Sequence, residues 1–226
     1  MELRIPPLKK AIFLNRLNRF VGEVEIEGRK ELVHIPNTGR LDRLLIKGNI
    51  VNLQPIQGKL RYRLFSVEDG EDIVVVDSFI GEKLLIEEWE KGGVFPIIGK
   101  IMRWKRAPII KGMRLDFLVE GERGIYIIEQ KSSTLLIGET AYFPDAPTER
   151  GYRQLLALFE AQKFGVIPML IMIIKHPKAK TFSFAHHIDE RFSRKAEEFT
   201  NKFPFLIFKL TIKEDELTLS PFEPPG

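Results

Sequence analysis

Short runs of alternating hydrophobic and polar residues fill the first part of the chain, and turn-forming residues separate them. Gly28, Gly48 and Gly58 mark three of these breaks. Five or more closely spaced strands with no helical periodicity between them predict a small closed β-barrel. An OB-like barrel suits about 75 residues of this pattern, and a small β-sandwich fits it nearly as well. The expected strands span residues 20–26, 31–35, 43–47, 50–54, 60–67 and 73–76.

The pattern changes after residue 78. Apolar positions at helical spacing, followed by two glycines, predict a helix over 81–91. The strand-like runs 114–119 and 124–131 are joined by four residues, so we expect an antiparallel hairpin. An amphipathic helix over 148–164 then precedes the run 166–174, which is apolar on both faces. Such a run is typical of a central strand that is covered by helices on each side.

The last part of the chain adds one more helix and two strands. Asp189 can cap a helix in which Phe192, Ala196, Phe199 and Phe203 repeat at helical spacing. Strands are expected at residues 205–212 and 216–219. The whole order predicts an α/β domain with a mixed sheet. We therefore expect an OB-like barrel at residues 1–78 and a mixed-sheet α/β domain at residues 79–226.

Residue counts narrow the possible chemistry. The 226 residues include no cysteine and four histidines, which excludes disulfides and thiolate sites and argues against the common zinc enzymes. Divalent metal chemistry would use carboxylates, which favours Mg²⁺ or Mn²⁺. The first residues lack a signal-peptide pattern, and the longest apolar run is half of the about 20 residues that span a membrane. We expect a cytoplasmic protein with no membrane partner.

Basic residues are concentrated in two parts of the sequence. Residues 1–66 contain 13 Lys and Arg but six Asp and Glu, and residues 99–114 contain six bases and no acid. Such clusters attract polyanions, although ordinary surface charge explains them equally well. Basic residues flank Tyr62 on both sides, and others flank Trp104 in the same way. Proteins that bind single-stranded nucleic acids by stacking combine basic residues and aromatic rings in this manner. The candidate nucleic-acid contacts from these stretches are Arg61, Arg63, Arg103, Lys105 and Arg114.

One constellation of charged residues could carry chemistry. Asp116 lies within an apolar strand, where an ionised carboxylate is unfavourable unless it has a partner. Glu129 and Lys131 are two residues apart on the next strand, so their side chains share a face. If the hairpin pairs as expected, the three groups converge on one pocket.

Phosphodiester hydrolysis uses this combination of groups. Asp116 and Glu129 are the candidate ligands of Mg²⁺ or Mn²⁺, which would activate water and neutralise charge on the phosphate. Lys131 could orient or deprotonate the nucleophile. A carboxylate–lysine pair at a strand end is the simpler structural alternative.

The chain resembles the sugar fermentation stimulation protein A family in five stretches that follow one another in the same order. The string Phe-Pro-Asp-Ala-Pro-Thr-Glu-Arg-Gly at 143–151 is the longest and most specific. The resemblance implies an OB-like barrel, a restriction-endonuclease-like domain of the PD-(D/E)xK type and DNA binding. It maps the nuclease-like residues onto Asp116, Glu129 and Lys131. The other stretches are residues 36–39, 114–117, 128–132 and 187–189.

The sequence departs from the family pattern near these residues. The family usually has a glutamate ahead of the strand that carries Asp116, whereas residues 103–106 are Arg-Trp-Lys-Arg. Gln154 stands where histidine is frequent. A missing third acid would weaken metal binding.

Two further segments are candidate DNA contacts. The polar loop at Asn37 and Thr38 lies beside Arg40 and Arg43 and could reach phosphates, which the resemblance favours over a simple turn. At the start of the 148–164 helix, Arg150 could hold a backbone phosphate, with Asp145 and Glu149 in support. The alternative for this second segment is helix capping.

Three functions are compatible with the sequence. The first is a DNA-binding protein that contacts the backbone without sequence preference and has a regulatory role. The second is an active Mg²⁺- or Mn²⁺-dependent nuclease, and the third is a protein-interaction module with incidental basic charge. We place DNA binding first, because several features favour it while the catalytic set lacks one expected acid.

Overall fold

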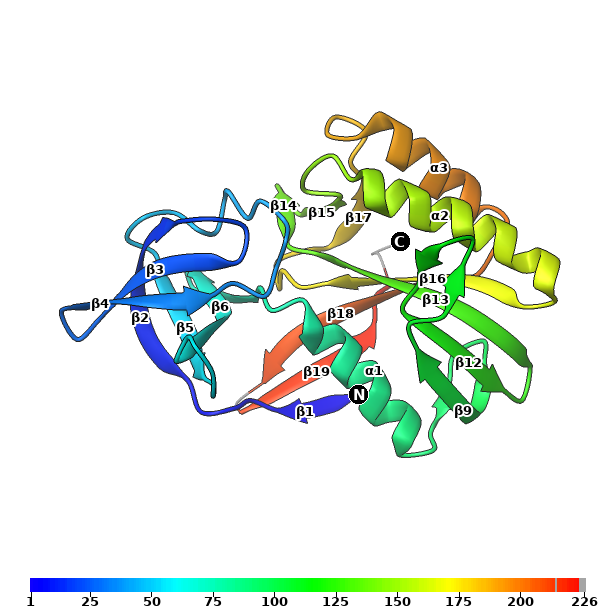
Figure 1. Ribbon diagram of the computed structural model, residues 1–226, viewed down its shortest axis with the longest axis horizontal. Helices are drawn as coiled ribbons and strands as arrows, with labels where there is room; N and C mark the ends of the chain where they lie inside the picture. The colour runs from blue at the N-terminus through cyan, green and yellow to red at the C-terminus, as the bar shows by residue number, and fades with distance from the viewer. Residues whose placement is uncertain (214, 224–226) are drawn as a thin grey trace.

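The computed structural model describes residues 1–213 and 215–223. Its N-terminal domain is a closed five-stranded barrel. Figure 1 shows this barrel beside the larger second domain. The strands pair in the order β4-β3-β2-β5-β6, and a parallel pairing of β4 with β6 closes the barrel. A sixth strand, β7, extends β6 by an antiparallel pairing. The closure confirms the OB-like barrel over the sandwich. The strands are β2 (Lys9–Arg16), β3 (Val21–Ile26), β4 (Arg29–His34), β5 (Ile50–Pro55), β6 (Tyr62–Asp69) and β7 (Asp72–Val75).

The strand predicted at 43–47 is wrong. Residues 42–44 form a turn, in which the amides of Leu44 and Leu45 donate to the carbonyl of Leu41. Leu41 and Leu44 are buried in the barrel core. The apolar residues of this segment therefore fill the end of the barrel from a turn rather than from a strand.

The second domain is built on an eight-stranded mixed sheet in the order β1-β19-β18-β16-β13-β12-β9-β8. Strands β13, β16 and β18 are parallel to one another, and the other pairings are antiparallel. The strands are β1 (Glu2–Arg4), β8 (Val94–Phe95), β9 (Gly99–Arg106), β12 (Phe117–Gly121), β13 (Gly124–Ser133), β16 (Ile167–Ile174), β18 (Phe205–Lys213) and β19 (Glu216–Pro221).

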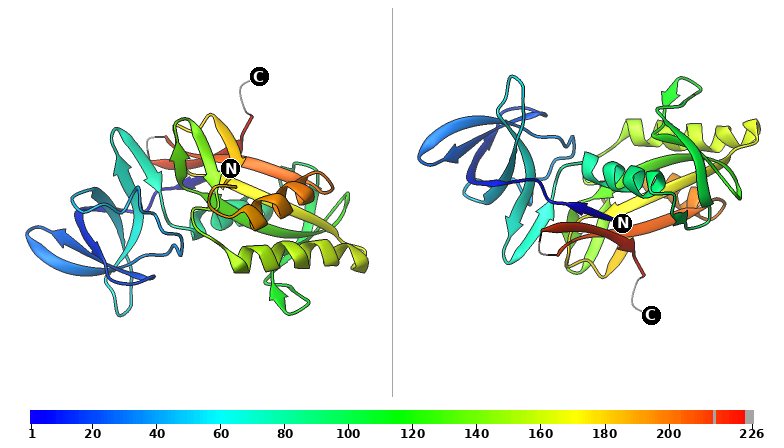
Figure 2. Two further views of the ribbon diagram at one scale, coloured as in Figure 1. Left: turned by 90° about the horizontal axis from the view of Figure 1, so that it is seen from above. Right: turned by 90° about the horizontal axis from the view of Figure 1, so that it is seen from below.

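Helices cover both faces of this sheet. Helix α1 (Phe79–Glu90) packs on one face, and α2 (Glu149–Ala161) and α3 (Glu190–Thr200) pack on the other (Figures 1 and 2). Strand β16, which is buried from Pro168 to Ile174, contributes side chains to both layers. Met169, Ile171 and Ile173 face α1, while Leu170 and Met172 face α2 and α3.

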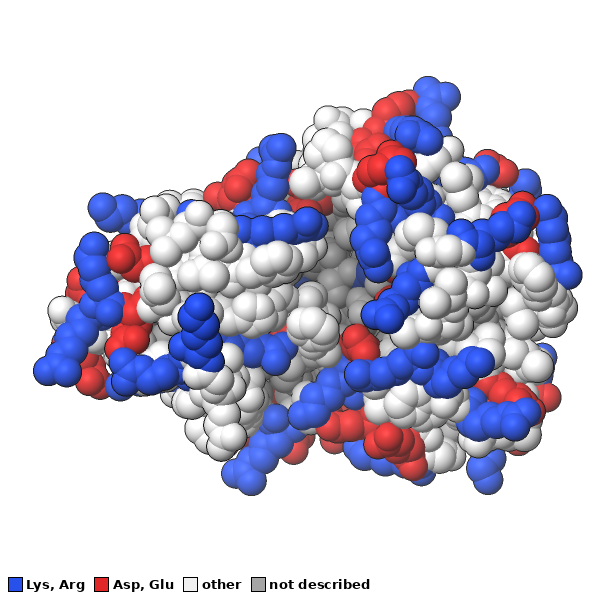
Figure 3. Space-filling view, viewed as in Figure 1, with Lys and Arg blue, Asp and Glu red and all other residues white. Residues whose placement is uncertain are grey.

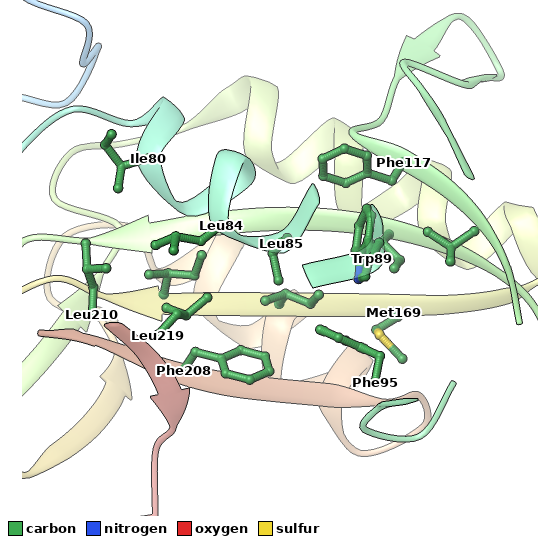
Figure 4. Close-up of a cluster of buried hydrophobic side chains, with 14 of the residues drawn as sticks. Ile80, Leu84, Leu85, Trp89, Phe95, Phe117, Met169, Phe208, Leu210 and Leu219 are labelled. Atoms are coloured by element: carbon green, nitrogen blue, oxygen red, sulfur yellow. The ribbon is translucent and has the colours of Figure 1, made fainter. Parts of the chain in front are cut away.

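The α1 layer has its own apolar core. Leu84, Leu85 and Trp89 of α1 are buried against the sheet, together with Phe117 and Phe208 (Figure 4). Burial of each such side chain contributes about 1.5–3 kcal/mol. This packing fixes α1, whose first turn lies beside the candidate site described below.

The predicted helices are confirmed with small changes at their ends. The helix predicted at 148–164 is α2 followed by a short 3₁₀ helix (Gln162–Phe164), and Gly165 ends it in the left-handed conformation at φ 71°. Asp189 caps α3 by accepting a hydrogen bond from the amide of Phe192 at 2.9 Å. Small strands complete the domain: β10 (Ile109–Ile110), β11 (Met113–Arg114), β14 (Leu135–Ile137), β15 (Thr140–Phe143) and β17 (Thr181–Phe184).

The strand predicted at 114–119 is interrupted. Residues 115 and 116 lie outside the strands, between β11 and β12. The amide of Leu115 donates to Pro108, and the carbonyl of Asp116 accepts from Ala107. Asp116 therefore stands at the start of β12 rather than in the middle of a strand.

Residues 2–4 belong to the second sheet, although the sequence assigns 1–78 to the barrel. Glu2 pairs with Thr218 and Arg4 with Glu216, so β1 is an edge strand beside β19 (Figure 2). Their alternation is too short to reveal which sheet they join. The chain leaves this sheet, forms the barrel and returns at α1.

Buried charged groups join the barrel to the second domain. Arg63 of β6 forms an ion pair with Asp77, which lies between β7 and α1. Lys175, just after β16, donates through Nζ to the carbonyl oxygen of Asp77. His176 lies 3.0 Å from Asp69 of the barrel. These contacts connect the end of the central strand with the barrel wall.

None of the helices in the described ranges combines the length and the apolar character that crossing a membrane would require.

Candidate active site

A cleft of about 490 Å³ lies between the barrel and the second domain. Figure 3 shows this hollow between the two halves of the molecule, with lysine and arginine side chains at its edge. The barrel contributes Asn37, Thr38 and Gly39, and the second domain contributes the other wall. Asp116, Glu129 and Lys131 all line it. The hairpin therefore brings the three predicted groups into one cleft.

The register of the hairpin explains how the two acids meet. Phe117 pairs with Ile128, so the next positions outward, Asp116 and Glu129, are brought opposite each other. One oxygen of Asp116 accepts a hydrogen bond from the amide of Gln130 at 2.7 Å. Glu129 is 2% exposed, and its Oε2 has no hydrogen-bond partner among the described residues. One carboxylate oxygen is thus left for a ligand.

Burial raises the pKa of both acids. The pKa of Glu129 rises to about 7, because desolvation outweighs the opposing effect of Lys131, and Asp116 adds a further rise. Burial also raises the pKa of Asp116, against the effects of Lys131, the Gln130 amide and Arg150. A cation in the cleft would favour the ionised form of each acid.

Two partners hold Lys131 in place. Its Nζ donates to Glu129 and, at 2.8 Å, to Oε1 of Gln154 in α2. The amide nitrogen of Gln154 donates to the carbonyl of Arg114 at 3.2 Å. Gln154 therefore links α2, β13 and the segment before Asp116.

Glu82 is a cleft residue that the sequence did not single out. It lies in the first turn of α1, lines the same cleft and forms an ion pair with Arg106 at 2.8 Å. Partial burial raises its pKa, and Asp116 contributes to this rise. The stretch 103–106, where an acid was missing, contacts this acid of α1 through Arg106, and no local signal in the sequence marks Glu82.

The close packing of α1 brings Glu82 to the cleft. A Cβ atom on Gly81 would lie 2.4 Å from Cδ1 of Ile173, so the missing side chain allows the helix to approach the sheet. Within the described ranges, no three His, Asp or Glu side chains are near enough to one another to hold a metal ion. The pair Asp116 and Glu129 is the part of the cleft that could hold one together with water or phosphate oxygens.

The loop at Asn37 lies against the second domain. Asn37 donates to the carbonyl of Val76 and accepts from the amide of Gly39, both at 2.8 Å. The backbone at Gly39 lies against the carboxylate of Asp145, and the nearby amides of Leu41 and Arg40 oppose the rise in its pKa. Asp145 thus joins the barrel to the other wall of the cleft, and burial raises its pKa.

The start of α2 combines capping with a contact to the cleft. Thr148 caps the helix by accepting from the amide of Gly151 at 3.1 Å. Glu149 forms ion pairs with Arg153 and Arg191 and is not among the residues that line the cleft. Arg150 is exposed and lines the cleft. The capping alternative accounts for Thr148, while Arg150 remains a candidate phosphate contact.

The remaining predicted bases lie outside this cleft. Arg40 and Arg43 line a neighbouring cavity of about 270 Å³. Arg61 pairs with Glu31, and Arg103 pairs with Glu120. Lys105 and Arg114 are exposed, whereas Arg63 is partly buried against Asp77. The basic stretch 99–114 is therefore partly neutralised by acids that are distant in the sequence.

Two family models together match most of the chain. The SfsA N-terminal OB domain matches residues 14–76, and the sugar fermentation stimulation protein RE domain matches residues 80–216. The chain belongs to the sugar fermentation stimulation protein family. This confirms the resemblance seen in the sequence, and the OB-like barrel with a mixed-sheet second domain is the fold of the family.

Relatives from different organisms are similar over most of their length. A sugar fermentation stimulation protein homolog of Aquifex aeolicus is 32% identical, with 96% of this chain and 97% of that protein covered. One of Pyrococcus furiosus is 36% identical, with coverage of 80% and 78%. The structure of Pyrococcus furiosus SfsA in complex with Ca²⁺ matches with a TM-score of 0.88 and 32% identity, covering 97% of this chain and 96% of that one.

Proposed function

We propose that the protein binds DNA in the cleft between its two domains and hydrolyses a phosphodiester bond there with the help of a divalent metal ion. The observation that carries the proposal is the buried pair Asp116 and Glu129 beside Lys131 in a cleft edged by bases. We take 1–78 and 79–226 as the two units, apart from β1.

The residues of the cleft fit a hard cation. Glu129 has an oxygen without a partner, and the pKa values of both acids are raised by burial, so a positive charge would relieve an unfavourable arrangement. Carboxylate oxygens suit Mg²⁺ or Mn²⁺, with water and phosphate oxygens completing the coordination. The Ca²⁺ complex of the Pyrococcus furiosus protein supports divalent-metal binding in this family. A bound ion would stabilise charge on the phosphate and lower the pKa of water.

The chain's own groups have separate roles in this proposal. Asp116 and Glu129 hold the cation. Lys131, fixed by Gln154, stabilises negative charge as the phosphate is attacked. Arg150 and the polar loop at Asn37 and Thr38 hold neighbouring phosphates through contacts that do not read sequence.

The OB barrel supports nucleic acid as the partner, because barrels of this type commonly bind oligonucleotides. Arg40 and Arg43 border the next cavity along the domain junction, which extends the basic surface beyond the cleft. Affinity should therefore fall steeply with salt.

A cleavage assay tests the proposal. Labelled single- and double-stranded DNA is incubated with the protein and Mn²⁺ or Mg²⁺. We expect cleavage that disappears in Asp116→Ala and Lys131→Ala. Lys163→Ala, which changes an exposed base in the 3₁₀ helix outside the cleft, is the matched control and should retain activity.

The same assay separates catalysis from binding alone. DNA that is bound tightly but stays intact would refute hydrolysis and leave a binding protein of the regulatory kind. Absence of binding at physiological salt would refute the nucleic-acid function altogether and favour a protein-interaction module.

A further inference from the structure

An exposed aromatic ring stands in the cleft beside the charged groups. Phe79 is 54% exposed, although it is a large apolar side chain at the start of α1. It lines the same cleft as Asp116 and Glu129. The next residue, Ile80, is buried in the α1 core. Phe79 is therefore directed away from the core and toward the cleft.

The barrel supports this ring from one side. The guanidinium carbon of Arg63 lies 5.3 Å from the centroid of the Phe79 ring, within cation–π range. Arg63 is itself held by its ion pair with the buried Asp77. The amide of Phe79 also donates to a carboxylate oxygen of Asp77 at 2.9 Å. Both the ring and the cation beside it are thus anchored to one buried acid.

The anchored ring shares the cleft with the proposed reaction centre, although the two are distant in the sequence. Three residues after Phe79, Glu82 lines the same cleft. Gly81 lies against Ile173, and the position of its absent Cβ is 3.7 Å from Nε2 of Gln130, the residue that follows Glu129. The first turn of α1 therefore lies beside the strand that supplies Glu129 and Lys131.

A supported, exposed ring of this kind suits a nucleobase. Every base has a flat π face, and stacking on an aromatic side chain tolerates any sequence. Inside a duplex both faces of each base are covered by neighbouring bases, and uncovering one requires unstacking. A ring in the cleft can therefore stack on a base that is unpaired or at a strand end.

The walls of the cleft also limit access. The barrel loop at Asn37, Thr38 and Gly39 reaches Asp145 of the second domain, and all four residues line the cleft. The backbone at Gly39 lies so near Asp145 that a Cβ there would be 2.3 Å from its Oδ2. This side of the cleft is closed by protein, which suits a single strand better than a duplex.

We propose that Phe79, backed by Arg63, is a stacking platform for an unpaired base, and that the cleft takes single-stranded DNA in preference to duplex. This inference rests on the proposed nucleic-acid function and specifies its substrate class. The stacked base would belong to a nucleotide adjoining the phosphate held near Asp116 and Glu129.

Equilibrium binding of a labelled oligothymidine and of a blunt duplex of equal length tests the inference, with EDTA present to keep the strands intact. Phe79→Ala removes the ring and Phe79→Trp retains an aromatic face. Phe164→Ala is the matched control, since Phe164 is also exposed, at 63%, but lies outside the cleft lining. Melting temperatures verify that each variant is folded.

The wild-type protein should bind the oligothymidine more tightly than the duplex. Phe79→Ala should weaken oligothymidine binding by about tenfold or more, as loss of one stacked base does. Phe79→Trp and Phe164→Ala should bind as the wild type does. Binding of the oligonucleotide should also quench the tryptophan fluorescence of Phe79→Trp more than that of the wild-type protein, which contains only the two native tryptophans.

Two results would overturn the platform while leaving the proposed function intact: unchanged oligothymidine affinity in Phe79→Ala, or an equal loss for both nucleic acids. Failure of the wild-type protein to bind either one would overturn both proposals.

Discussion

The Nζ atom of Lys131 donates to Oε1 of Gln154 at 2.8 Å, which connects the strand that carries Glu129 to helix α2. The Nε2 atom of the same side-chain amide donates to the carbonyl of Arg114. Gln154 is 4% exposed, so both ends of its amide are used inside the protein. The orientation of Lys131 thus depends on a residue outside the hairpin.

Replacement of Gln154 by alanine should therefore reduce catalysis more than binding. Lys131 keeps Glu129 as a partner but loses the contact that aims it, so we expect kcat for DNA cleavage to fall by about tenfold with little change in KM. Steady-state kinetics provide the measurement. Gln162→Ala, which changes an exposed glutamine just after the same helix, is the control. A rise in KM alone would contradict the orienting role of Gln154.

Metal affinity should depend on pH. Binding of a cation requires ionised carboxylates, and burial raises the pKa of Glu129 to about 7. Glu129 is mostly protonated near pH 6 and mostly ionised near pH 8, so Mn²⁺ should bind about tenfold more weakly at the lower pH. Titration calorimetry at the two pH values measures this. Equal affinities at both would contradict ligation by Glu129.

Glu129 should also make the stability of the metal-free protein fall as pH rises. Its pKa is about 7 in the folded protein and near 4.5 when exposed, so the folded state binds more protons between these values. The contribution of Glu129 to stability is largest below about pH 4.5 and declines until about pH 7. Glu129→Gln removes this decline, although Lys131 loses a partner. The melting temperature of the variant minus that of the wild type should increase from pH 5 to pH 8, and a constant difference would refute the raised pKa.

Glu82 should matter for the reaction although it lies on another element. Its side chain lines the cleft near Asp116, so we expect Glu82→Gln to lower metal-dependent cleavage by about tenfold and to leave DNA affinity nearly unchanged. Glu87→Gln on the same helix is the control, because Glu87 is not among the residues that line the cleft. Wild-type rates in Glu82→Gln would exclude a role for this acid.

Lys175 provides a test of the domain junction. Burial lowers its pKa from 10.5 to about 8, so the unfolded chain binds more protons between these values and stability rises with pH across this range. Lys175→Met fills the same space without a charge and should not show this rise. Thermal melts near pH 8 and near pH 10 compare the two proteins. If the melting temperatures of the two proteins change equally between these pH values, Lys175 is charged in the folded state and its pKa is not lowered.

Local patterns were sufficient for much of this molecule. The apolar run at 166–174 was predicted as a central covered strand and is β16, and Asp189 was predicted as a cap and caps α3. Asp116, Glu129 and Lys131 were predicted to converge because a short hairpin leaves few registers. In each of these cases neighbouring residues determine the outcome.

Other features depend on packing between distant segments. Residues 99–114 were noted for their basic charge, and their first half, Gly99–Arg106, is strand β9. The charged residues on the exposed face of this strand hide its alternating pattern. Leu41 and Leu44 were expected near a strand but fill the barrel from a turn. Glu82 reaches the cleft because Gly81 lets α1 approach Ile173, a contact between residues far apart in the sequence.

The pairing of β1 with β19 has a mechanical consequence for the barrel. The barrel is joined to the large sheet twice along the chain, through β1 before it and through α1 after it. A swivel about a single linker is therefore unavailable. Phe65 and Val75 of the barrel are also buried in the core that α1 forms with the large sheet, so separating the two walls of the cleft would expose apolar surface that they share.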